Sequence, residues 1–185
     1  MRARLESPEY LSLVRGAFKA WDDAETQEKR EYIKRLIMNA GVTKLVPDDL
    51  VRLFVSWIRQ YHESHFAVIK QIYKQPGITR GEMWDQVHTD RPREDSAEAG
   101  LFSYLIRDLS MGGVIHQDKQ TNDAGQYMKR RPVHVPKGMG SQTMESAFEG
   151  TKSYVLTELG RQFIRYVLND AVLRVGAESA HDNDA

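Results

Sequence analysis

The chain has 185 residues, of which 41% are hydrophobic and 28% charged, and its 26 basic and 26 acidic residues leave a formal net charge of zero. This length and composition are typical of one globular domain, with or without an extension, and favour neither a disordered chain nor a membrane protein. Any affinity for an anionic partner must therefore depend on local charge, and the lack of cysteine excludes disulfides, thiolate metal sites and a cysteine nucleophile.

Two amphipathic helices are predicted at the amino terminus. The first should begin at Ser7 and Pro8, because proline is favoured in the first turn of a helix. Thr26 is a suitable cap for the second, which should end near Gly41. The apolar residues that mark these amphipathic segments are Tyr10, Leu11, Leu13, Val14 and Phe18 in the first helix and Tyr32, Ile33, Leu36, Ile37 and Ala40 in the second.

A third and longer helix is predicted from residues 47–49 to the break at Gln75, Pro76 and Gly77. Its apolar residues fall in two adjacent stripes, and such a wide apolar surface implies contacts on two sides. The main stripe comprises Leu50, Phe54, Trp57, Tyr61, Val68 and Ile72. The first four members of this stripe are our candidates for a homodimer interface.

Shorter elements are predicted after the break. Thr79 can cap a short helix and Ser96 a longer one, which Gly112 and Gly113 should end. A short strand, "VIHQD", follows, and residues 118–150 lack a sustained period, so we interpret them as a long excursion between two strands. The longer helix should direct five apolar side chains inward, namely Leu101, Phe102, Leu105, Ile106 and Leu109.

The second strand passes directly into a helix. In "SYVLTELGRQFIRYV", from Ser153 to Val167, a β-branched and aromatic run gives way at Thr157 to apolar residues at helical spacing. The resulting order of helices and strands resembles the winged helix-turn-helix domain. The end "YVLTELGRQFI" is similar to the second wing strand and following helix in regulators of the MarR and PadR type. The stretches "GITRGEMWDQV" and "LFSYLIRDLSMGGVIHQDK" fit the second helix, third helix and first wing strand.

The resemblance covers roughly residues 60–168 and implies a mainly α fold with a small β-hairpin wing. On this basis we predict an N-terminal helical extension over residues 1–47 and a winged-helix domain over residues 48–175, with a long wing at 118–150. Residues 176–185 are small, polar and acidic, so we predict a disordered tail there. The segment from Trp21 to Gln117 also resembles uncharacterised bacterial proteins.

The winged-helix resemblance implies binding to double-stranded DNA, with the third helix in the major groove and the wing on the backbone or minor groove. Ser103, Tyr104 and Arg107 are the outward candidates on that helix. Over residues 79–113, however, four basic residues stand against seven acidic ones, and this net charge of −3 opposes phosphate binding. The wing has the opposite sign, since residues 126–140 carry a net charge of +4. Its basic residues are Lys129, Arg130, Arg131 and Lys137.

Two functions are compatible with these patterns. The first is a non-enzymatic DNA-binding protein, a transcriptional regulator that acts as a homodimer and takes much of its affinity from the wing. The alternative is a protein-interaction or dimerisation module, in which the acidic second and third helices form a docking surface and no nucleic acid is bound. Local charge leaves both open, because the helices favour one function and the wing favours the other.

The sequence carries no signal for a cofactor, an enzyme or a membrane. It lacks a phosphate loop, a dinucleotide-binding fingerprint and a nucleophile elbow, so we expect no enzymatic activity. His62 and His65 are three residues apart, which is not the zincin spacing, and we expect no metal. The amino terminus has no apolar stretch of signal-peptide length, and no run approaches the ~20 apolar residues of a membrane span. We therefore expect a cytoplasmic protein.

Overall fold

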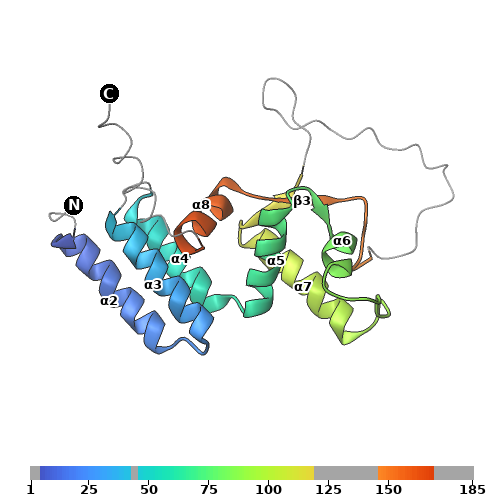
Figure 1. Cartoon of the computed structure of the whole chain (residues 1–185), viewed down its shortest axis with the longest axis horizontal. Coiled ribbons are helices and arrows are strands. Elements are labelled where there is room, and N and C mark those ends of the chain that lie inside the picture. Colours follow the sequence, from blue (N-terminus) through green and yellow to red (C-terminus); the bar gives the residue numbers. More distant parts are fainter. Residues whose placement is uncertain (1–4, 43–45, 119–145, 169–185) are drawn as a thin grey trace, which may run out of the picture. The chain divides into compact units, whose positions relative to one another are not determined.

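The computed structural model describes residues 5–42, 46–118 and 146–168 (Figure 1). These ranges hold seven helices and a small antiparallel sheet of three strands, so the described chain is mainly helical. No helix within them is long and apolar enough to cross a membrane. The chain divides into two compact units, one made by the described residues of Met1–Glu63 and Glu158–Ala185, the other by those of Ser64–Thr157. We call them the helical unit and the sheet unit.

The helical unit contains α2 (Pro8–Asp22), α3 (Gln27–Val42), α4 (Asp48–Gln60) and α8 (Glu158–Val167). Both predicted amino-terminal helices are confirmed together with their caps. The Ser7 hydroxyl accepts a hydrogen bond from the Tyr10 amide at 3.3 Å, and Thr26 Oγ1 accepts one from the Lys29 amide at the same distance. Such bonds satisfy amides that have no partner inside the first turn of a helix.

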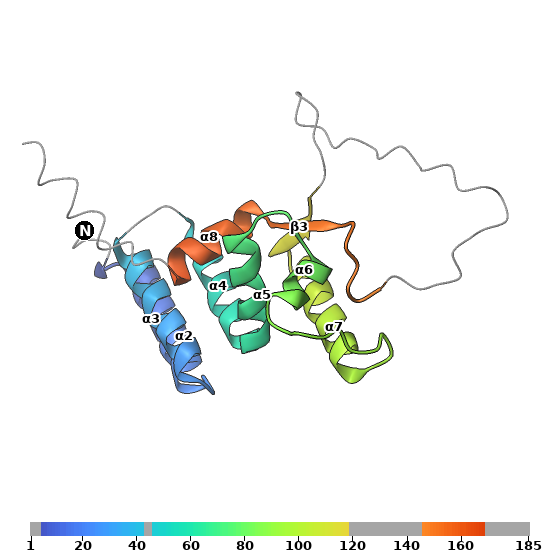
Figure 2. The same ribbon diagram turned by 45° about the vertical axis from the view of Figure 1, so that its right-hand side comes forward.

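An aromatic cluster forms the centre of this unit. The Phe54 ring lies 5.5 Å from that of Trp57 and 5.4 Å from that of Phe163, centroid to centroid, and Trp57 lies 5.4 Å from Phe163. Nearby, the Asn39 side-chain amide donates a buried hydrogen bond of 2.8 Å to the Tyr166 carbonyl. Helix α8 therefore packs beside α3 and α4, although the whole sheet unit lies between them in the sequence (Figure 2).

The prediction of one continuous helix up to residue 74 is wrong. Helix α4 ends at Gln60, and Tyr61 has extended backbone angles of φ −81° and ψ 140° before α5 (Glu63–Lys74) begins. No glycine or proline marks this break, and the apolar period continues across it, so the sequence offered no local stop signal. Since α4 and nearly all of α5 fall in different units, the compact units also divide the chain elsewhere than the predicted boundary after residue 47.

The sheet unit runs α5, β1 (Ile78–Thr79), α6 (Arg80–Asp85), α7 (Ala97–Met111), β2 (Ile115–Gln117) and β3 (Ser153–Leu156). The central strand β3 pairs antiparallel with both β1 and β2. Strand β1 is an element that the sequence does not predict, because two residues are too few for a periodic pattern and Thr79 also caps α6. The glycine breaks are confirmed, since Gly77 (φ +88°) and Gly113 (φ +73°) adopt the left-handed conformation that side chains disfavour.

Helix α7 buries one face against the rest of the sheet unit. Phe102, Leu105, Ile106 and Leu109 are buried as predicted, together with Ala99. The prediction for Leu101 is wrong, because 55% of this residue is exposed. A helical turn holds 3.6 residues, so Leu101 points about a quarter turn or more away from the centre of the buried face.

The direct passage from strand to helix is confirmed. Strand β3 ends at Leu156, α8 starts at Glu158, and only Thr157 lies between them. The Thr157 amide donates to the Val114 carbonyl at 3.0 Å, and its hydroxyl donates to the Gly113 carbonyl at 2.7 Å. These bonds hold the residue after β3 against the segment that follows α7, so the chain enters α8 without a loop.

Candidate nucleic-acid interface

An open hollow of about 610 Å³ lies on the outward face of α7, beside β2. Ser103, Tyr104 and Arg107, the three outward candidates of the sequence, all line it. They are brought together because positions i, i+1 and i+4 share one side of a helix. The other lining residues are Arg80, Gly100, Ser110, Ile115, His116, Gln117 and Tyr154.

The charged side chains among the described residues that line this hollow are all basic. Arg107 comes from α7 and Arg80 from the start of α6, and His116 of β2 adds an imidazole ring. Arg80 is held in place, because its Nε donates to the Tyr154 hydroxyl at 2.9 Å and its guanidinium carbon lies 5.4 Å from the centre of the Tyr154 ring. No local pattern in the sequence pointed to this arginine, since its partner is 74 residues away.

Tyr104 is partly exposed to solvent and also contacts a buried histidine. Half of the residue is exposed, and its ring lies nearly perpendicular to the buried His65 ring, with 6.2 Å between the ring centres. His65 Nε2 in turn lies 3.2 Å from the Asp108 carboxylate. An aromatic ring presented to solvent in a cationic hollow is suited to stacking on a planar ligand.

No acidic residue of this region is among the described residues that line the hollow, although seven fall between residues 79 and 113. Five of them make contacts elsewhere: Glu82 caps α6, Asp85 pairs with Arg91, Asp95 pairs with Arg93, Asp108 lies beside His65, and Glu94 binds the segment after residue 145. The net charge of −3 therefore does not describe the lining of the hollow.

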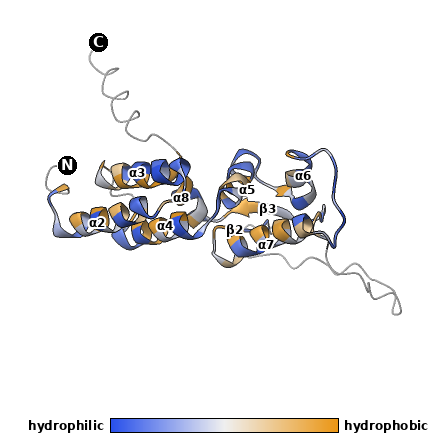
Figure 3. Cartoon of the chain, turned by 90° about the horizontal axis from the view of Figure 1, so that it is seen from below, coloured by the Kyte–Doolittle hydropathy of each residue, from blue (hydrophilic) through white to orange (hydrophobic). Residues whose placement is uncertain are grey.

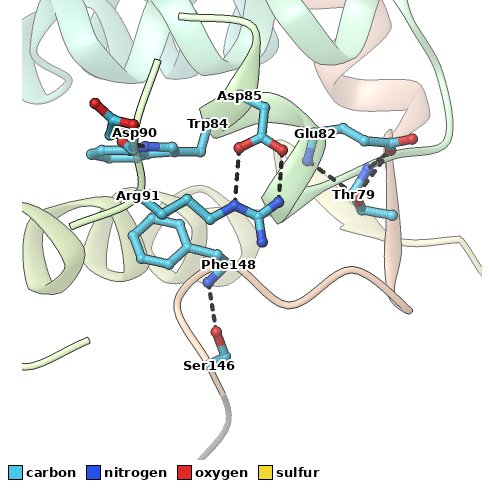
Figure 4. Close-up of polar contacts among 8 residues, drawn as sticks. All are labelled: Thr79, Glu82, Trp84, Asp85, Asp90, Arg91, Ser146 and Phe148. Carbon is cyan, nitrogen blue, oxygen red and sulfur yellow. Dashed lines mark hydrogen bonds and ion pairs between the residues drawn. The ribbon is translucent and has the colours of Figure 1, made fainter. Parts of the chain in front are cut away.

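Helix α6 begins with a capping box (Figure 4). The Glu82 amide donates to Thr79 Oγ1 at 3.3 Å, while the Thr79 amide and hydroxyl donate to the Glu82 carboxylate at 2.8 and 2.9 Å. The backbone hydrogen bond from Thr79 is the main reason why the pKa of Glu82 lies below its ordinary value. This motif fixes where α6 starts, and hence where Arg80 is held.

A second set of contacts ties the connection between α6 and α7 to residues 146–148 (Figure 4). Arg91 makes two hydrogen bonds to Asp85, of 2.9 and 2.6 Å, and its guanidinium carbon lies 5.9 Å from the Phe148 ring centre. Phe148 is buried against Trp84, with 4.9 Å between the ring centres. Gly81 permits this approach, because a Cβ there would lie 2.8 Å from the Arg91 guanidinium.

The remaining predicted site residues are not among the described residues that line the hollow. Lys129, Arg130, Arg131 and Lys137 of the predicted wing lie outside the described residues. His65 is buried and His62 exposed, and no group of three or more histidine, aspartate or glutamate side chains in the described ranges could hold a metal ion.

The predicted homodimer stripe is largely covered by the chain itself. Phe54, Trp57 and Tyr61 are at most 4% exposed, and Leu50 is half-buried. Phe163 and Tyr166 of α8 supply much of the cover for Phe54. The stripe thus serves the core of the helical unit and leaves little surface for a second subunit.

Comparison of the chain with protein-family models, with curated proteins and with solved structures finds no match.

Proposed function

We propose that the sheet unit is a winged helix-turn-helix domain that binds double-stranded DNA through the outward face of α7. The order of elements supports this assignment, since α5, α6 and α7 correspond to the three helices of that domain and β2 and β3 to the strands of its wing. The pairing of β1 with β3 completes the small sheet. In such domains the third helix enters the major groove.

The observation that carries the proposal is the hollow on α7, with its two arginines and no acidic lining residue among those described. Arg80 and Arg107 offer planar guanidinium groups that suit phosphate oxygens or a guanine edge. Ser103 and Tyr104 offer hydroxyl groups for base edges or sugar. The phosphate contacts provide affinity, and the base contacts provide preference for a sequence.

The basic residues of the predicted wing extend this proposal. Lys129, Arg130 and Arg131 are the densest positive charge in the sequence. We propose that they add phosphate contacts, so that the protein acts as a non-enzymatic transcriptional regulator in the cytoplasm.

The test is an anisotropy titration of the full chain with random-sequence duplex over a range of salt concentrations. Replacing Arg80 and Arg107 by alanine should weaken binding to all sequences and reduce the slope of log affinity against log salt by about two units, because each arginine neutralises one phosphate. The matched control replaces Arg52 and Arg93, which are exposed arginines outside the hollow, and should keep the native slope. A triple alanine variant of Lys129, Arg130 and Arg131 should lower the slope by about three units.

Two results would reject the proposal. Native protein that binds no duplex at low salt would exclude DNA as the partner. Equal loss of affinity in the hollow variant and in its control would show that general charge, rather than this face of α7, attracts DNA. The alternative, a protein-interaction module without nucleic acid, is favoured by one observation: α2 carries an apolar face that the described part of the chain leaves exposed.

A further inference from the structure

Helix α2 has apolar residues on two of its faces (Figure 3). Its inner face, formed by Tyr10, Leu13, Ala17 and Ala20, is buried in the helical unit. A second face carries Leu11, Val14, Phe18 and Trp21, and the exposed fractions of Leu11, Phe18 and Trp21 are 44%, 64% and 41%. Three large apolar side chains so exposed on one helix indicate an interaction surface.

Residues of α3 extend this outer face into a groove. Val14, Phe18 and Trp21 line a groove of about 260 Å³ together with Ile33, Ile37 and Met38, which is 49% exposed. Lys34 is the only charged side chain among the described lining residues. The groove is thus apolar, as the centre of a protein interface is.

We propose that a second copy of this chain covers the groove, with the two α2 helices packed antiparallel about a two-fold axis. Leu11, Val14, Phe18 and Trp21 are spaced three, four and three residues apart, which is the alternation of a and d positions in a heptad. In an antiparallel pair this stripe is complementary to itself. Leu11 meets Trp21 of the partner subunit, and Val14 meets Phe18 of the partner subunit.

The charges beside the stripe fit the same arrangement. Arg15 and Asp22 are exposed and occupy equivalent positions, seven residues apart, on one flank of the stripe. In the register that aligns the apolar residues, Arg15 of one subunit and the partner subunit's Asp22 are separated by about 7.5 Å along the helix axis, at 1.5 Å per residue. Each side chain leans toward the start of its own helix, so the two lean toward each other. Two-fold symmetry forms this pair twice.

A parallel pair would lack these contacts. In a parallel pair, Arg15 would face the side of the neighbouring apolar stripe that is opposite to its own. That side holds Tyr10 and Ala17, which carry no charge. The charge pattern therefore selects a second copy in the antiparallel orientation.

Sedimentation velocity of the full chain without DNA tests the interface independently of the proposed DNA binding. We expect a dimer at tens of micromolar and at least tenfold weaker association for Phe18→Glu, because a carboxylate would be placed in the apolar contact. Circular dichroism checks that each variant keeps its helices, and since Phe18 is 64% exposed we expect it to fold. Lys19→Asp, a charge reversal on α2 beyond the apolar stripe, should dimerise like the native chain.

A charge swap tests the orientation. Arg15→Asp and Asp22→Arg alone should each weaken the dimer by about threefold to tenfold, since each creates two like-charge pairs. The double variant should recover native affinity, because each pair is restored with its signs exchanged. A native monomer, or a dimer that Phe18→Glu leaves intact, would overturn the interface. A double variant no stronger than the single ones would overturn the antiparallel register.

Discussion

The two units position their parts by different kinds of contact. In the helical unit, α4 and α8 meet through buried aromatic rings, and Phe54 is fully buried. In the sheet unit a buried core is also present, but exposed polar contacts fix the backbone at two places. Thr79 and Glu82 fix the start of α6, and the Asp85–Arg91 pair ties the connection between α6 and α7 back to α6. From this comparison we infer that stability and positioning depend mainly on different contacts in this chain. Burial dominates the first, while exposed polar contacts direct the backbone around the proposed DNA-binding face.

The largest predicted effect falls on the aromatic cluster of the helical unit. Phe54→Ala should lower the free energy of unfolding by about 3–5 kcal/mol, because it removes apolar contacts and leaves a cavity. The control on the same helix, Ser56→Ala, changes an exposed residue and should stay within about 0.5 kcal/mol of the native chain. Urea denaturation followed by circular dichroism measures both, and equal effects would contradict the assigned core.

The capping box of α6 should have a smaller effect. Thr79→Ala removes a helix cap and should cost about 1 kcal/mol, whereas Thr89→Ala in the exposed connection should be neutral. Chemical denaturation measures the difference. An unchanged free energy of unfolding in Thr79→Ala would show that the capping box contributes nothing to stability.

The capping box should also make the stability of the protein depend on pH. The folded-state pKa of Glu82 is lowered, so its contribution to stability is present above the unfolded pKa and is lost as the pH falls through the folded pKa. Thr79→Ala removes the hydroxyl hydrogen bond but keeps the backbone amide that is the larger cause, so the pKa of Glu82 should move only part of the way up toward its ordinary value and the acid-dependent loss should shrink in part. A carboxyl titration followed by NMR reads the pKa directly, and an unmoved value would contradict the assigned hydrogen bonds.

The smallest effect is expected at the exposed ion pair of the α6–α7 connection. The pKa of Asp85 is lowered chiefly by its hydrogen bonds from Arg91, so Arg91→Leu should raise it toward the ordinary value. Arg93→Leu is the matched control, because Arg93 pairs with Asp95, and it should raise the pKa of Asp95 and leave that of Asp85 unchanged. Both variants should change stability less than Thr79→Ala does, since the pairs are exposed. The reverse ranking would contradict the separation of stability from positioning.

The sequence predicted the elements whose signals are local. Caps at Ser7, Thr79 and Ser96, the glycine stops and the strand-to-helix change at Thr157 depend on neighbouring residues, and each is found where expected. The break at Tyr61 has no such signal, because no glycine or proline stands there and the apolar period continues across it.

Which apolar face is covered also depends on tertiary structure. Periodicity identified apolar residues on both α2 and α4, but it could not show that α8 covers Phe54 while Phe18 stays exposed. For the same reason Ser103, Tyr104 and Arg107 could be predicted as outward residues of one helix, whereas Arg80 could not be joined to them. Its place in the hollow depends on strand pairing across the sheet.

Photo-crosslinking from α7 tests the central claim most directly. A photoreactive phenylalanine analogue replaces Tyr104, which is 49% exposed in the hollow, and in a matched control it replaces Tyr73, which is 44% exposed on α5. Each full-length protein is irradiated with random-sequence duplex at low salt. If α7 docks on DNA, position 104 should crosslink to the duplex and position 73 should not. Crosslinking from neither position, or equally from both, would contradict the assignment of this face as the DNA-binding surface.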